Sequence, residues 1–192
     1  FQIDTVECHF TLSPMATRVV STLQVSRNPE AKSTPANLIL DGEKLRLIGV
    51  KLDGNDLNTD QYDINDVALT INNVPDQFTL NIETEIDPET NTSLEGLFLS
   101  SGNFCTQCEA EGFRKITYYL DRPDVMSVFT VTMEADKLQF PVLLSNGDLV
   151  DSGDLADGKH WAKWHDPHKK PCYLFALVAG DLSLTKDHYT TT

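Results

Sequence analysis

The alternation of apolar and polar residues with a period of two is the feature that most constrains this fold. Residues 6–12, 78–86 and 129–133 place an apolar side chain at nearly every second position. Residues 17–25 do the same with apolar and hydroxyl side chains. Successive side chains of a strand point to opposite faces, so the pattern predicts strands with one buried face.

Further strands are expected where the pattern is less regular. Residues 45–52 alternate around Gly49, which predicts a bulge, and residues 67–71 alternate briefly. Residues 140–144 and 173–179 are denser apolar runs, which predict strands buried on both faces.

Turn residues separate these segments. The Asx-Gly pairs predict tight hairpin turns; they are Asp41-Gly42, Asp53-Gly54, Asn146-Gly147 and Asp157-Gly158. One short helix is expected over residues 121–126, capped by Asp121 and with Pro123 in its first turn. No change in composition divides the chain, so we expect residues 1–192 to form one all-β domain of antiparallel sheets, a sandwich or stacked sheets.

Length and charge restrict the partners. The chain has 192 residues and a formal net charge of −14. Such a surface repels phosphates, so no nucleic acid and no anionic membrane is expected as a partner. The longest apolar run, residues 172–179, is too short to span a bilayer. The chain begins at Phe1 within an expected strand and ends without a closing element, so we expect it to be part of a longer protein.

The cysteines offer one motif that two kinds of chemistry use. Four cysteines are few for a disulfide scaffold, and a core of this size needs no disulfide, so we expect reduced thiols and a cytoplasmic location. Cys105 and Cys108 form a Cys-x-x-Cys pair, which serves as a redox dithiol or as half of a zinc site. The β-rich surroundings and the lack of a second ligand pair favour neither.

Metal binding and catalysis have weak signals elsewhere. His160, His165 and His168 precede Cys172, but their spacing matches no standard metal site, so we expect surface histidines on a loop. The sequence has no His-Glu-x-x-His segment, no Gly-rich phosphate loop and no Gly-x-Ser-x-Gly elbow. We therefore expect no metal site and no catalytic residue in this chain.

Gln107 and Glu109 lie in the stretch richest in polar groups. If residues 105–109 are extended, both side chains point to the same side and present a carboxylate beside an amide carbonyl. Such a pair suits a cationic amine. From the residues alone, the alternative of solvated turn residues is the stronger one.

The same stretch resembles the aminopeptidase N family of zinc metallopeptidases. That family carries Gln-x-Glu, an Arg five residues after the Glu and Asp-x-Pro seven residues after the Arg. The matching positions here are Gln107, Glu109, Arg114, Asp121 and Pro123. The string from Cys105 to Arg114 is similar to the bacterial alanyl-aminopeptidase branch. Residues 91–97 also fit, and residues 170–181 resemble the strand that leads towards the catalytic domain.

The resemblance implies a saddle-like N-terminal domain that closes one side of an active-site cleft. It implies that Gln107 and Glu109 bind the free α-amine of a peptide substrate. The zinc ligands and catalytic residues would lie in a catalytic domain outside this chain, which alone would be inactive. We expect the docking face for that domain near residues 172–179 and near Tyr118 and Tyr119.

Two alternatives remain. An epoxide hydrolase of the leukotriene A type shares the strand at residues 171–178, but carries Gln rather than Glu at the position of Glu109. A free-standing β-sandwich binding module has no such motif, so the match over residues 107–123 disfavours it.

Overall fold

The largest element of the fold is an eight-stranded sheet. The computed structural model describes residues 1–30 and 36–190. The strand order is β13-β14-β11-β1-β2-β8-β4-β5. Neighbours pair antiparallel except β1 and β11, which run parallel. The bounds are β1 Gln2–Thr11, β2 Thr17–Ser26, β4 Arg46–Leu52, β5 Asn55–Asp56, β8 Gln77–Ile86, β11 Met126–Asp136, β13 Asp148–Asp154 and β14 Lys159–Pro171.

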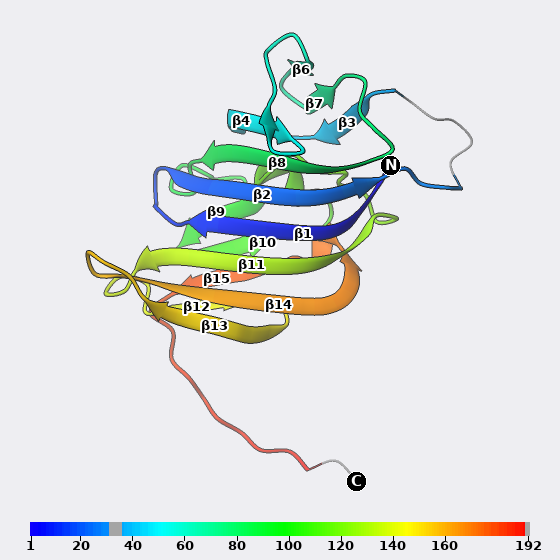
Figure 1. The fold of residues 1–192 in the computed structure, drawn as a ribbon. Helices are drawn as coiled ribbons and strands as arrows, with labels where there is room; N and C mark the ends of the chain where they lie inside the picture. Colours follow the sequence, from blue (N-terminus) through cyan, green and yellow to red (C-terminus); the bar gives the residue numbers. More distant parts are fainter. Residues whose placement is uncertain (31–35, 191–192) are drawn as a thin grey trace.

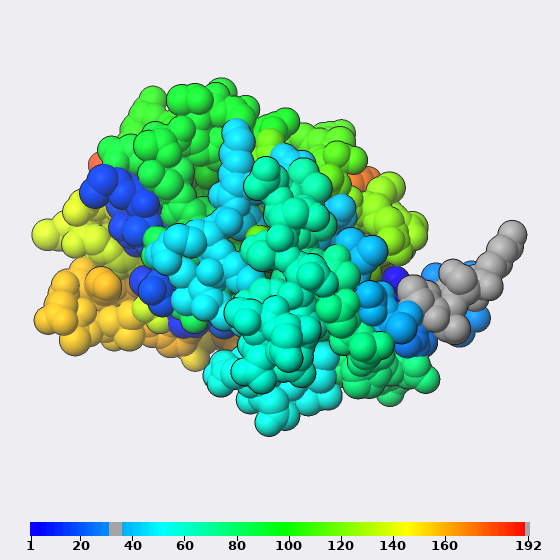
Figure 2. Space-filling view, turned by 90° about the horizontal axis from the view of Figure 1, so that it is seen from above, coloured from blue at the N-terminus to red at the C-terminus, as the bar shows by residue number. Residues whose placement is uncertain are grey.

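Two smaller sheets accompany the large one (Figure 1). The four-stranded sheet has the order β12-β15-β10-β9, and the three-stranded sheet has the order β3-β7-β6. Their bounds are β3 Leu38–Asp41, β6 Tyr62–Ile64, β7 Ala68–Ile71, β9 Gly96–Ser100, β10 Asn103–Gln107, β12 Val142–Ser145 and β15 Leu177–Gly180. Figure 2, seen from above, shows the segment from β3 to β7 spread across the upper face of the molecule.

The period-two prediction is confirmed in the long strands. In β2 the inward residues Val19 and Leu23 are fully buried, and Leu80 of β8 lies opposite Leu23 in the register. The inward faces pack on an aromatic cluster in which Phe113 contacts Tyr119 and Phe175, with ring centroids 5.0 and 5.1 Å apart. Burial of these side chains is the main stabilising contribution to the fold.

Inward-facing hydroxyl groups connect the large sheet to the segment that follows Phe113. Ser21 Oγ and Thr117 Oγ1 are hydrogen-bonded at 2.9 Å, and Thr84 Oγ1 donates to the carbonyl of Ile116 at 3.0 Å. All four residues are buried, so these polar atoms are satisfied where water does not reach. The segment at residues 113–117 is therefore fixed against the sheet.

The predicted helix at residues 121–126 is wrong. These residues form a turn in which the N–H of Val125 donates to the carbonyl of Arg122 at 3.3 Å. Asp121 does not cap a helix at residues 121–126, because its carboxylate is buried against Arg114, and Val125 is drawn into the core. The described residues instead contain two single-turn 3₁₀ helices, η1 at Phe113–Lys115 and η2 at Cys172–Leu174.

The dense apolar runs are strands only in part. β12 is an edge strand that buries Leu143 and leaves Leu144 40% exposed. The second run begins as η2 and becomes a strand only at Leu177. Tyr118 and Tyr119 were expected near a docking face, but both lie in the core.

The bulge prediction is confirmed, and the tight-hairpin prediction is confirmed at Asp53-Gly54, between β4 and β5, and at Asp157-Gly158, between β13 and β14. It is wrong at Asn146-Gly147 and at Asp41-Gly42, because β12 and β13, like β3 and β4, belong to different sheets. The register of β4 against β8 shifts at Gly49, as expected for a bulge. Gly54, Gly147 and Gly158 have positive φ, which suits tight turns. Gly42 has no positive φ; a Cβ there would meet the ring of Tyr118 at 2.1 Å, so glycine is needed for close packing. Among the described residues, no helix is long and apolar enough to cross a membrane.

Candidate functional site

Glu109 lies in a short loop, residues 108–112, called the Glu109 loop below. β10 ends at Gln107, so the extended backbone assumed for residues 105–109 stops short of Glu109. Both side chains are exposed, while Cys108 between them is buried. Gln107 Nε2 donates to the main-chain carbonyl of Glu109 at 3.2 Å, so the structure brings the two residues together through the loop. The peptide bond between Glu109 and Ala110 is cis.

Glycine closes the Glu109 loop. The N–H of Gly112 donates to the carbonyl of Cys108 at 2.9 Å. A Cβ at Gly112 would lie 2.3 Å from the carbonyl oxygen of Gln107, which is closer than van der Waals contact allows. Only glycine fits this turn, and it returns the chain directly into η1.

The loop forms one wall of a pocket of about 230 Å³, called the Glu109 pocket. Its lining residues are Glu109, Ala110, Glu111, Asp121, Arg122, Pro123 and Tyr173. Glu111 forms an ion pair with Arg114 at 3.4 Å. Over residues 1–30 and 36–190, no side chain forms a hydrogen bond or ion pair with the Glu109 carboxylate. An exposed carboxylate without a counter-ion is available to a cation that enters the pocket.

Asp121, one of the lining residues, forms a buried ion pair with Arg114. Arg114 Nε donates to Asp121 Oδ2 at 3.0 Å, and the Asp121 side chain is fully buried. Burial lowers the pKa of the Arg114 guanidinium, but the hydrogen bond and charge of Asp121 outweigh it, so the pKa is raised overall. The other carboxylate oxygen, Oδ1, accepts a hydrogen bond from Cys172 Sγ at 2.9 Å.

Neither thiol of the Cys-x-x-Cys pair is activated by its surroundings. All four cysteines are free; Cys105 is half-buried on β10, and Cys108 is buried. Burial raises the pKa of the Cys105 thiol. Burial, followed by the charge of Asp121, raises that of Cys108. The thiolate that redox chemistry and metal binding require is therefore disfavoured at both positions.

The three histidines lie on β14 and not on a loop, because β14 extends over Lys159–Pro171. His160 Nε2 is hydrogen-bonded to the carbonyl oxygen of Phe140 at 2.8 Å, and His165 Nδ1 is hydrogen-bonded to Thr130 Oγ1 at 2.9 Å. Cys172 Sγ instead faces Asp121. The part of the chain that the structure describes contains no group of three or more His, Cys, Asp or Glu residues that could hold a metal ion. These residues therefore do not fit a zinc ion.

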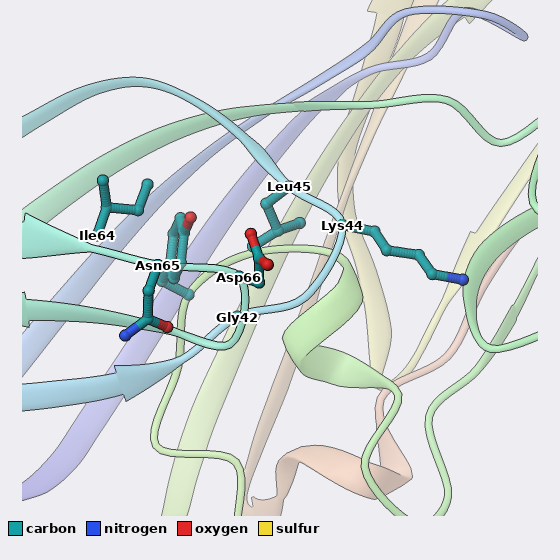
Figure 3. A pocket seen from close by; sticks show the side chains of 7 residues that line it. Gly42, Lys44, Leu45, Ile64, Asn65 and Asp66 are labelled. Carbon is teal, nitrogen blue, oxygen red and sulfur yellow. The ribbon is translucent and has the colours of Figure 1, made fainter.

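Another pocket, of about 430 Å³, lies between the turn at Gly42 and the β6–β7 connection (Figure 3). Asn65 Oδ1 accepts hydrogen bonds from the N–H groups of Val67 and Ala68, at 2.9 and 3.0 Å, and so fixes that connection. The side chain of Lys44 points away from Asp66 in Figure 3. The charged groups do not converge on one ligand position, so the Glu109 pocket is the better candidate site.

Some parts of the Glu109 pocket were not predicted. Tyr173 and Arg122 line it, yet neither was a candidate binding residue. The Asp-x-Pro pattern at Asp121 and Pro123 was the sequence signal that pointed to the part of the lining around Arg122. The contact between Asp121 and Cys172 joins residues distant in sequence and left no local pattern.

Comparisons with known proteins agree on one family. The model of the peptidase M1 N-terminal domain matches residues 6–174. The whole chain is 51% identical to aminopeptidase N of Caulobacter vibrioides and 48% identical to aminopeptidase N of Escherichia coli, and it spans 22% and 21% of those relatives.

Solved structures show the same fold. Legionella pneumophila aminopeptidase A in complex with aspartic acid has a TM-score of 0.90 and 34% identity, covering 95% of this chain and 21% of that one. Yeast LTA4 hydrolase has a TM-score of 0.75 at 23% identity, covering 95% of this chain and 29% of that one, which shows the fold alone. The match over residues 6–174 is decisive, and the chain belongs to the peptidase M1 N-terminal domain family.

Proposed function

We propose that this chain is the N-terminal domain of a zinc aminopeptidase, where it closes one side of the active-site cleft and binds the free α-ammonium of the peptide. The observation that carries the proposal is the Glu109 carboxylate, which is exposed at a pocket and lacks a counter-ion among the described residues. The two aminopeptidase N relatives support the reaction class.

Recognition of a free N-terminus requires a group that distinguishes an ammonium from an internal amide. A fixed carboxylate does so because its charge-assisted hydrogen bond to an ammonium group is stronger than its hydrogen bond to a neutral amide N–H. The Gln107 amide nitrogen is engaged by the carbonyl of Glu109, which leaves the Gln107 side-chain oxygen as a neutral acceptor. We propose that Glu109 binds the charge and that Gln107 supports the loop and adds this acceptor.

The metal and the catalytic groups belong to other parts of the enzyme in this proposal. The described residues do not fit zinc, so no step of the reaction is assigned to a metal held by this chain. Its partners are the catalytic domain of the same enzyme and peptide substrates with a free N-terminus. A cytoplasmic location is proposed from the four free thiols.

The test is Glu109→Gln in the full-length enzyme, assayed on an alanyl anilide with a free amine. Loss of a hydrogen bond to a charged group costs about 1.5–3 kcal/mol, so kcat/KM should fall roughly ten- to hundredfold. The matched control is Glu83→Gln, because that carboxylate lies on β8, outside the pocket lining, and is paired with Arg18. Unchanged kcat/KM in the Glu109 variant refutes the assignment. A loss that accompanies a collapse of the melting temperature indicates a structural residue.

A further inference from the structure

Both walls of the Glu109 pocket are attached to one buried carboxylate, that of Asp121. The Glu109 loop lines the pocket as its first wall, and Tyr173 of η2 lines it as a second wall. Asp121 also contributes to the pocket lining, and its side chain is fully buried. Arg114, two residues after the Glu109 loop, and Cys172, next to Tyr173, each donate a hydrogen bond to this carboxylate.

The first wall is held through η1, which follows the Glu109 loop. The first N–H groups of a helix have no partner within the helix, and the residue before η1 is Gly112, which has no side chain to cap them. Asp121 Oδ2 accepts the N–H of Arg114 at 3.0 Å and so supplies the missing cap. The Arg114 Nε donates to the same oxygen at 3.0 Å, and Nη2 donates to the main-chain carbonyl of Asp121 at 3.0 Å.

The second wall is held through Cys172. Its Sγ donates to Asp121 Oδ1 at 2.9 Å. Burial raises the pKa of the Cys172 thiol, which keeps the proton that this hydrogen bond uses. Cys172 is the first residue of η2, whose turn is closed by the N–H of Phe175 donating to the carbonyl of Cys172 at 3.0 Å. Tyr173, the next residue, lines the pocket together with the Glu109 loop.

Asp121 is itself fixed by a third segment. Its N–H donates to Asp41 Oδ2 at 3.1 Å. Asp41 ends β3 and bridges Tyr119 through two main-chain hydrogen bonds of 2.8 and 3.0 Å. The carboxylate therefore has a defined position, and it transmits that position to both walls.

We propose that Asp121 is a positioning residue for amine recognition: it holds the Glu109 loop and Tyr173 at the separation that fits a peptide N-terminus. This inference rests on the proposed function of Glu109. A shift of about 1 Å in a binding group can reduce the rate about a hundredfold. Loss of the hydrogen bonds that Arg114 or Cys172 donates to Asp121 therefore affects catalysis through the placement of Glu109.

The test is a double-mutant cycle in the full-length enzyme with Asp121→Asn and Glu109→Gln, assayed on the alanyl anilide. Asparagine has nearly the same shape but replaces one acceptor oxygen by an NH₂ donor. It therefore loses the hydrogen bonds to one of the two carboxylate oxygens, and it loses the ion pair with Arg114. We expect Asp121→Asn alone to lower kcat/KM about tenfold or more. In the Glu109→Gln background it should lower kcat/KM less than about threefold, because the group it positions is gone.

The outcomes separate the two proposals. If Glu109→Gln has no effect, the proposed function fails, and the positioning role fails with it. If Glu109→Gln costs activity and Asp121→Asn adds its full loss on top, the positioning role alone is overturned. Asp154→Asn serves as the control and should leave kcat/KM unchanged. Asp154 is an exposed residue at the end of β13 and is paired with Lys137.

A second variant covers the case in which Asp121→Asn does not fold. Cys172→Ala removes only the thiol donor and leaves the ion pair between Arg114 and Asp121 in place. It should lower kcat/KM about threefold or more, with a smaller melting shift than Asp121→Asn, and the loss should disappear in the Glu109→Gln background. A loss that persists there overturns the proposal, and so does unchanged activity.

Discussion

Replacing Arg114 by methionine should destabilise the chain by about 3 kcal/mol, although the residue lies near the surface. The Asp121 side chain is fully buried and that of Arg114 is 15% exposed. Removing one partner of a buried ion pair costs about 3–5 kcal/mol, because the remaining charge loses its compensation in a medium of low polarity. The pair at Arg114 and Asp121 is of this kind.

The lower end of that range follows from what the variant keeps. Asp121 still accepts the N–H of residue 114 and the Sγ–H of Cys172. The methionine side chain retains most of the apolar contacts of the arginine stem. The donors lost are Nε to the carboxylate and Nη2 to the carbonyl of Asp121. The Asp121 charge loses its counter-ion but keeps two hydrogen-bond donors, so we expect the free energy of unfolding to fall by about 3 kcal/mol.

Urea unfolding of the 192-residue chain measures this value as a lower midpoint at unchanged slope. The matched control is Arg18→Met, because Arg18 pairs with Glu83 while the two side chains are 49% and 32% exposed. An exposed pair contributes about 0–1 kcal/mol. Adding Asp121→Asn to Arg114→Met should recover part of the loss by removing the buried charge. Equal losses for Arg114→Met and Arg18→Met, or a further loss in the double variant, would refute the reasoning.

Three further predictions concern the same chain. Gly42→Ala should cost about 1–3 kcal/mol in urea unfolding, because its Cβ meets the Tyr118 ring, whereas Gly49→Ala should be close to neutral because nothing lies within 4 Å. A thiol reagent should label Cys105 first in the folded chain, and the three buried cysteines only on unfolding; simultaneous labelling of all four contradicts the burial. Metal analysis of the purified chain should find no stoichiometric zinc after a mild chelator, and retained zinc would contradict ligands outside this chain.

The strands were predictable because their signal is local. Alternation at Val19 and Leu23 reflects one buried face, and both side chains are fully buried. The parallel pairing of β1 with β11 was not predictable, because Val6 and its register partner Phe129 are far apart in sequence. No local pattern encodes which distant strand becomes the neighbour. The sheet order therefore needed the structure, although the fold class did not.

The helix expected at residues 121–126 failed for a related reason. Asp121 followed by Pro123 suits a helix start when only local contacts are considered. In the folded chain the two oxygens of this carboxylate accept hydrogen bonds from Arg114 and Cys172 instead, and both bonds lie in a buried setting where they are strong. Tertiary contacts therefore determined the conformation of this segment. For the same reason, the motif located Glu109 but did not reveal that Tyr173 lines the same pocket.

Asp121 and Glu109, two of the three carboxylates that line the pocket, have different environments, which suit them to different roles. Asp121 accepts hydrogen bonds from two residues and is buried, so it has little capacity left for a ligand. Glu109 is exposed, and no described side chain pairs with it. The net charge of −14 attracts any cation, but salt screens exposed charges over about 10 Å at 0.1 M. Long-range attraction therefore does not distinguish a peptide N-terminus from another cation. Discrimination requires contact at a fixed distance, and the groups that fix the Glu109 loop and Tyr173 meet at Asp121.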